Sequence, residues 1–187
     1  MKKNITYIGY WLLVIGFICV SCGPEARLDM VGMFAGTSPT IDERFTESKV
    51  YNDKHGFTTL QASVDDYRVY VCTDTHVTKT QTRWTHFIDT YRHDPMCPVA
   101  VHLGDIIDAQ NYFDEMYSAY QAVPLNPAKR DTLMAVAGNH DIYFKQWPEY
   151  IKYFKTCYYY FVVETPSGQK DLFVVYDSAD GTVGSKQ

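Results

Sequence analysis

Three short segments of the chain carry side chains of the kinds that bind metal ions. They are "TDTH" with Asp74 and His76, "GDIID" with Asp105 and Asp108, and "GNHD" with Asn139, His140 and Asp141. Oxygen and imidazole ligands without a thiolate favour divalent ions such as Mn, Fe or Zn. Asp105 could bridge two ions, because a carboxylate has two oxygens. Two ions close together can clamp a phosphate and activate a water molecule between them.

Each of these segments follows an apolar stretch with the composition of a β-strand, at residues 67–72, 99–103 and 133–137. Helical patterns alternate with these strands at residues 81–91, 109–122 and 146–154, and two further strands are expected at 158–164 and 171–176. This alternation predicts an α/β fold with a partly parallel sheet. Because ligands bind at the carboxyl ends of parallel strands, the three polar segments are expected to meet at one edge of the sheet.

Each segment taken alone has a simpler interpretation. Asp105 and Asp108 are typical turn and N-cap residues, and Asn139 and Asp141 are common in turns. The joint occurrence of all three segments at strand ends favours the metal site. The remaining histidines lack such a context: His102 is expected to be a hydrogen-bonded core residue, and His86 and His93 to lie on a helix surface.

The order and approximate spacing of D-x-H, G-D-x-x-D and G-N-H-D resemble those of the calcineurin-like metallophosphoesterases, from about Tyr67 to the C-terminus. The resemblance implies an α/β fold that is an incomplete sandwich of this family, with a mixed β-sheet, flanking helices and no C-terminal half. It implies hydrolysis of a phosphate mono- or diester by metal-activated hydroxide.

The resemblance also implies a role for each residue. Two divalent ions (Mn, Fe or Zn) are expected. The first would be held by Asp74, His76 and Asp105, and the second by Asp105 and Asn139. His140 would protonate the leaving oxygen, Asp141 would orient His140, and Asp108 would support the ligands from outside. A carboxylate beside His140 favours the imidazolium, which can donate a proton.

The sequence departs from the family pattern after His140. Family members carry further histidines in the C-terminal half, one isolated and then a G-H-x-H pair, and these complete both metal sites. No histidine follows His140 in these 187 residues. Whether this chain binds both ions is therefore open. The alternative is a catalytically inactive fragment, or a lipid-anchored binding module that kept the scaffold without the chemistry.

The N-terminus reads as an export signal. Lys2 and Lys3 precede an apolar stretch at residues 8–20 that is shorter than the ~20 residues of a spanning helix. The following cysteines resemble a bacterial lipoprotein signal in which Cys22 is lipidated; an ordinary cleaved signal and a plain membrane anchor are the alternatives. We expect a signal peptide at 1–21, a tether and lead-in segment at 22–63 and the phosphoesterase domain at 64–187. Such a protein would be a membrane-anchored lipoprotein of the cell envelope.

The overall composition narrows the range of partners. An apolar content of 46% and a charged content of 21% are typical of a globular protein. The net charge is −5 and no dense cluster of Lys and Arg occurs, which argues against a nucleic-acid-binding surface. The expected partners are a phosphoester substrate and, through the lipid, a membrane. The sequence does not identify the substrate or a protein partner.

Overall fold

The structure is a computed structural model that describes residues 38–108, 112–127, 131–143 and 145–187. The expected signal peptide and Cys22 lie outside these residues. Every strand and helix expected from Tyr67 onward is present. Their ends differ from expectation by one or two residues, apart from the start of the helix expected at 109, where residues 109–111 are not described. None of the described helices combines the length and the apolar character that crossing a membrane requires.

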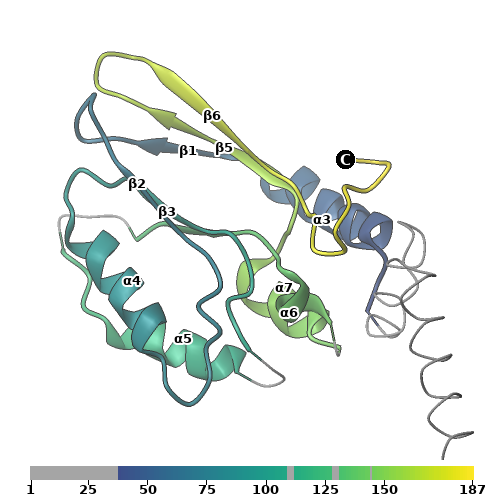
Figure 1. The fold of residues 1–187 in the computed structure, drawn as a ribbon. Helices are drawn as coiled ribbons and strands as arrows, with labels where there is room; N and C mark the ends of the chain where they lie inside the picture. Colours follow the sequence, from purple (N-terminus) through teal and green to yellow (C-terminus); the bar gives the residue numbers. More distant parts are fainter. Residues whose placement is uncertain (1–37, 109–111, 128–130, 144) are drawn as a thin grey trace, which may run out of the picture. The chain divides into compact units, whose positions relative to one another are not determined.

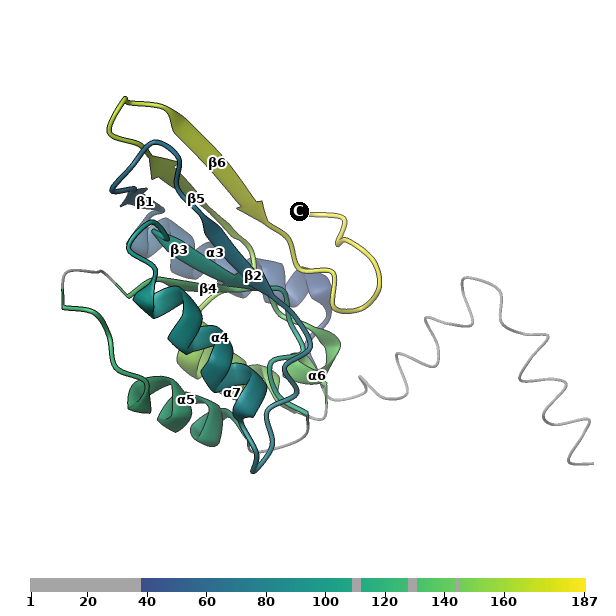
Figure 2. The same cartoon turned by 60° about the vertical axis from the view of Figure 1, so that its left-hand side comes forward.

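The first sheet is parallel and contains the three strands that precede the polar segments. Its order is β2 (Val69–Cys72), β3 (Val99–His102) and β4 (Leu133–Ala135), with Cys72 opposite His102 and His102 opposite Ala135. Helices α4 (Thr82–His93) and α5 (Phe113–Ala122) cover one face of it (Figures 1 and 2).

Helix α4 packs on the sheet through an apolar stripe. Its buried residues Trp84, Phe87, Ile88 and Tyr91 follow the spacing i, i+3, i+4, i+7, which puts them on one face of a helix. The rings of Trp84 and Phe87 contact His102 on β3, at centroid distances of 5.6 and 6.0 Å. This face of the sheet is therefore closed by α4.

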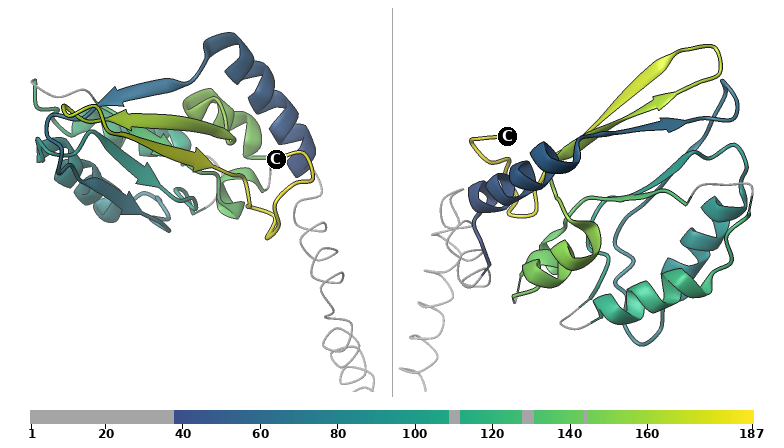
Figure 3. Two further views of the ribbon diagram at one scale, coloured as in Figure 1. Left: turned by 90° about the horizontal axis from the view of Figure 1, so that it is seen from above. Right: turned by 180° about the vertical axis from the view of Figure 1, so that it is seen from behind.

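The second sheet consists of β1 (Thr58–Gln61), β5 (Tyr159–Glu164) and β6 (Lys170–Val175). β1 pairs parallel to β5, and β5 and β6 form an antiparallel hairpin. The two sheets lie against each other, as Figure 3 shows from above. Their shared core contains seven buried residues: Leu60, Ala62, Val99, Val101, Phe161, Val163 and Val175. The result is a mixed α/β sandwich, as expected.

Part of the expected lead-in segment has regular structure. Helix α3 (Ile41–His55) begins at a capping box in which Thr40 and Glu43 satisfy each other's backbone N–H groups. Its chain then continues into β1, which joins the second sheet. The two remaining helices are α6 (Asn139–Ile142) and α7 (Trp147–Phe154), which follow β4 in sequence.

One side of the sandwich is open. A cleft of about 520 Å³ lies between β2 and β6 and is lined mainly by apolar residues of both sheets. Val71, Leu103, Leu172 and Val174 are between 47% and 62% exposed on these two edge strands and the residue after β3. The described residues thus leave apolar surface uncovered on these strands.

Candidate metal centre

The loops that follow β2 and β3 run side by side beyond the ends of the strands. The Asp74 and His76 backbone N–H groups donate to the carbonyls of Gly104 and Asp105, at 3.1 and 3.2 Å. A bridge between Val77 and Ile107 extends the pairing further. These bonds bring "TDTH" and "GDIID" together, as the parallel sheet predicts.

The loop after β4 is pressed against the loop after β3 through two glycines. A Cβ atom on Gly104 would lie 2.6 Å from the Gly138 nitrogen. A Cβ atom on Gly138 would lie 2.2 Å from a carboxylate oxygen of Asp105. Because no side chain fits at these distances, both positions require glycine for the close approach of the two backbones. The approach also lets the His140 N–H donate to Asp105 Oδ1 at 2.9 Å.

Three of the expected ligand residues have left-handed backbone conformations. The φ angles are 52° for Asp74, 45° for His76 and 53° for Asp105. Asp and His tolerate this region better than most residues, yet each such position costs of order 1–3 kcal/mol. Strained residues that are held in place by their surroundings are concentrated at functional sites. The three values support a functional role for this edge of the sheet.

Asp74, His76 and Asp105 form a first group of potential ligands. One ligand atom from each lies within 4.8 Å of the others. His76 Nε2 is 3.6 Å from Asp74 Oδ1, and the Thr73 hydroxyl donates to Asp74 Oδ2 at 2.6 Å. The Thr73 hydrogen bond, followed by the charges of His76 and His102, lowers the pKa of Asp74 against the opposing effect of desolvation. Asp74 is therefore anionic near neutral pH.

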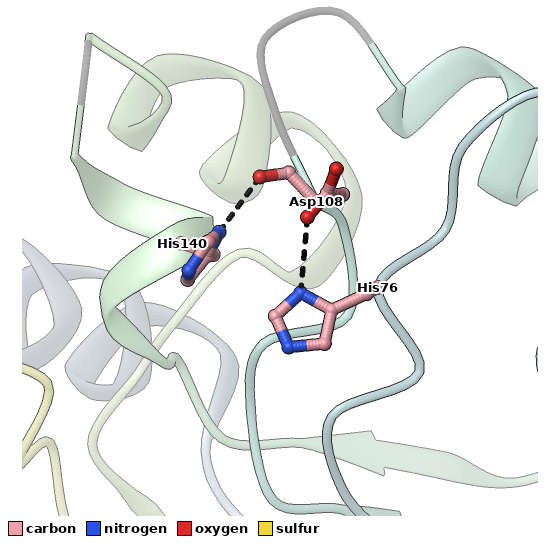
Figure 4. Close-up of side chains that lie close together, drawn as sticks. All are labelled: His76, Asp108 and His140. Atoms are coloured by element: carbon pink, nitrogen blue, oxygen red, sulfur yellow. Dashed lines mark hydrogen bonds and ion pairs between the residues drawn. The ribbon is translucent and has the colours of Figure 1, made fainter.

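A second group of potential ligands contains His76, Asp108 and His140, and Figure 4 shows their side chains. His76 Nδ1 is 3.4 Å from Asp108 Oδ1, and the rings of His76 and His140 meet edge to face at a centroid distance of 4.8 Å. The His140 Nδ1 atom is 2.7 Å from the backbone carbonyl oxygen of Asp108. Asp108 thus contacts both histidines directly, whereas the resemblance implies only that it supports the ligands from outside.

The structure gives Asp141 a different task from the one expected. Its buried carboxylate accepts the backbone N–H groups of Ile106 at 2.9 Å, Ile107 at 3.3 Å and Gly138 at 2.9 Å. It therefore ties the "GNHD" turn to the "GDIID" loop, and the group that orients the His140 ring is the Asp108 carbonyl. Burial, together with the charge of Asp105, raises the pKa of Asp141 to about 7 against the three N–H groups.

Asn139 is the first residue of α6 and is half-buried beside His140. Among the described residues, no hydrogen bond engages its side-chain amide.

His102 and Thr75 support the centre from beneath. His102 is fully buried, and its Nδ1 accepts the Gly104 N–H at 3.2 Å, which leaves the proton on Nε2 to be donated to the Thr75 hydroxyl at 3.0 Å. Thr75 in turn donates to the Ile106 carbonyl at 3.0 Å. Burial lowers the pKa of His102 to about 4, so the ring is neutral at pH 7. The expectation of a hydrogen-bonded core histidine is confirmed, whereas no pattern in the sequence indicates the role of Thr75.

The donor chemistry fits divalent cations. Asp74 and Asp105 place two carboxylates within 4.8 Å of each other, and a cation between them relieves that repulsion. His76 Nδ1 is buried and makes no hydrogen bond, although Asp108 Oδ1 lies 3.4 Å away, which is unusual for a polar atom and leaves it able to bind a cation on the Asp108 side. Asp74, His76 and Asp105 could hold one ion, and Asp105 and Asn139 could contribute to a second.

Comparison with known proteins identifies the family. The model of the calcineurin-like phosphoesterases matches residues 67–184, which include all three polar segments. No curated protein and no solved structure shows a significant match to the chain. The sandwich of two sheets is consistent with part of that family's fold. The family model covers well over half of the sequence, and the chain belongs to the calcineurin-like phosphoesterase family.

Proposed function

We propose that the protein is a metal-dependent phosphoesterase that hydrolyses a phosphate mono- or diester at the edge of the β2-β3-β4 sheet. The observation that carries this proposal is the convergence of Asp74, His76 and Asp105, all in left-handed conformations, within 4.8 Å of one another. Bound divalent ions would neutralise phosphate charge and make a water molecule more acidic.

His140 is the residue best placed to supply a proton. Its Nδ1 faces a carbonyl oxygen, which can only accept, so Nδ1 carries a hydrogen. Nε2 is then the ring nitrogen that would deliver a proton to the leaving oxygen. The backbone of His140 is fixed by its N–H bond to Asp105, so the ring keeps a constant position relative to a proposed metal ligand.

The test uses the full chain, loaded with Mn²⁺, and p-nitrophenyl phosphate and bis(p-nitrophenyl) phosphate as substrates. Asp105→Asn is expected to lose most metal affinity and activity, whereas His140→Ala retains metal and loses turnover. His86→Ala is the matched control, because His86 is an exposed histidine on α4. Wild-type activity in both site variants, measured on pure metal-loaded protein, would refute the assignment.

A second candidate function is a binding module without hydrolytic activity. Within these 187 residues, the family pattern supplies only Asp105 and Asn139 as ligands of a second ion. Metal analysis separates the two candidates. About two ions per chain support the enzyme, and none supports the binding module.

The proposal extends to location. We propose that the protein is exported and anchored in the cell envelope through a lipid on Cys22, which lies outside the described residues. Cys22→Ser is expected to move the protein from the membrane fraction to the soluble fraction. A variant that remains in the membrane fraction would contradict lipid anchoring at this residue.

A further inference from the structure

Helix α3 is attached to the rest of the fold through a polar face. Its buried residues are Arg44, Ser48 and Asn52, which are spaced by four and therefore share one side of the helix. The Arg44 guanidinium donates twice to Asp177, at 2.6 and 3.1 Å, and once to Asp180, at 3.0 Å. A buried charge that loses its partner is strongly destabilising, so these contacts hold α3 in one position.

Two further bonds link this part of the chain to α6, which carries Asn139 and His140, and to α7, which follows it. The Ser38 hydroxyl, two residues before the N-cap of α3, donates to the Ile142 carbonyl of α6 at 2.5 Å. Glu47 on α3 accepts the indole N–H of Trp147, the first residue of α7, at 2.7 Å. Helix α6 is therefore held both through its own Asp141, whose carboxylate accepts N–H groups of the "GDIID" loop, and by the α3 segment.

The loop after β6 adds a third link. Asp177 and Asp180, which bind Arg44, flank Ala179, and the Ala179 carbonyl accepts the Tyr143 hydroxyl at 3.4 Å. Tyr143 is the C-cap of α6. The Arg44 guanidinium also lies 5.9 Å from the ring centroid of Trp147. Arg44 thus holds a loop that contacts α6 and, in addition, faces the start of α7.

We propose that the α3 segment is a positioning element of the metal centre, which sets the place of Asn139 and His140 through Ser38, Glu47 and Arg44. The segment precedes residues 67–184, which match the family, so the role belongs to this chain and does not follow from the family match. Its effect on metal binding rests on the proposed function, whereas its effect on the order of residues 138–143 does not.

The test removes the two bonds without leaving a buried charge. In the full chain, Ser38→Ala/Glu47→Ala is compared with Ser38→Thr/Glu47→Gln, which keeps a hydroxyl donor and an acceptor for the indole N–H. Lys49→Ala is the control, because Lys49 is an exposed residue of the same helix whose ion pair is with Asp53, one turn further along α3. Hydrogen exchange of amides 138–143 and Mn²⁺ affinity are measured well below the unfolding midpoint of every variant.

We expect the alanine pair to speed exchange at 138–143 about tenfold and to weaken Mn²⁺ binding about tenfold, since two hydrogen bonds are lost. The conservative pair should stay within about twofold of wild type, as should Lys49→Ala. Exchange at 138–143 that is equal in the alanine pair and in Lys49→Ala would overturn the proposal. If wild type binds no Mn²⁺, the proposed function fails, and the exchange measurement still decides whether α3 positions α6.

Discussion

Replacing Gly138 by alanine is a direct perturbation of the proposed ligand Asp105. The added Cβ atom would lie 2.2 Å from Asp105 Oδ1 and 2.3 Å from the Asp105 nitrogen. Gly138 has a φ angle of −96°, which alanine adopts without strain. The substitution therefore tests steric displacement of Asp105, side chain and backbone together, without strain in the φ angle of residue 138.

The size of the effect follows from these distances. Cβ contacts below 3.0 Å essentially do not occur, so the Asp105 carboxylate must move by about 0.8 Å or more. Overpacking of this kind typically costs about 1–3 kcal/mol of stability. A displacement near 1 Å at a reacting group can lower a rate by about 10²-fold. We expect Mn²⁺ affinity and turnover to fall by a similar factor.

The assay compares Gly138→Ala with Gly168→Ala. Gly168 has a φ angle of 87° and open space around its Cβ position, so alanine there strains the backbone without a steric clash. Gly168→Ala should lose about 1 kcal/mol of stability and retain Mn²⁺ affinity. Gly138→Ala should lose affinity even at temperatures where it is fully folded. Equal Mn²⁺ affinities in Gly138→Ala and wild type would refute the reasoning that the two loops are packed this closely.

Three further predictions concern pH and metal removal. Burial lowers the pKa of His102 to about 4 in the folded protein, below its ordinary value of 6.5. Between these two pH values, the unfolded chain binds a proton at His102 that the folded protein does not bind. The metal-free protein should therefore lose up to about 3 kcal/mol as pH falls from 6.5 to 4, and denaturant titration of His102→Gln should show a weaker dependence. Burial raises the pKa of Asp131, but the bonds from Arg92 and two tyrosines outweigh it and lower the pKa below 3.8. The ionised Asp131 carboxylate stabilises the folded protein fully above about pH 4, and this stabilisation disappears at lower pH. In thermal unfolding, Asp131→Asn should therefore remove this part of the loss of stability in acid. At a free metal concentration of 100 times the Kd, removing the metal with a chelator should lower the free energy of unfolding by about 2.7 kcal/mol. An unchanged unfolding midpoint would contradict metal binding to the native state.

The parallel sheet and its ligand-bearing edge could be predicted because both leave a local signal. Strands β2, β3 and β4 are short apolar stretches, and each is followed within a few residues by Asp, His or Asn. Parallel pairing then brings the strand ends together whatever the details of the loops. The contact of His102 with a hydroxyl could also be expected, because a buried imidazole requires partners.

Helix α3 could not be predicted in the same way. Its buried face consists of Arg44, Ser48 and Asn52, so the sequence lacks the apolar period on which helix prediction depends. The partners of Arg44, Asp177 and Asp180, lie more than 130 residues away, and no local rule connects them. The capping box at Thr40 and Glu43 is the one local sequence feature that indicates the start of this helix.

The family resemblance implies that Asp141 orients the His140 ring, and the structure gives the two side chains different partners. Neighbouring residues of a helical turn point in different directions, so Asp141 faces the Ile106 and Ile107 backbone while His140 faces Asp108. The close approach of Gly104 and Gly138 likewise depends on the distance between two strands, which the sequence does not specify.

The most direct test of the central claim is the location of a bound ion. A crystal of the full chain grown with Mn²⁺, and measured at a wavelength where manganese scatters anomalously, would place the ion without reference to the protein's geometry. We predict an anomalous peak bounded by Asp74, His76 and Asp105, with the Asn139 amide facing the same space. A peak bound elsewhere, or no peak with these side chains directed apart, would contradict the account.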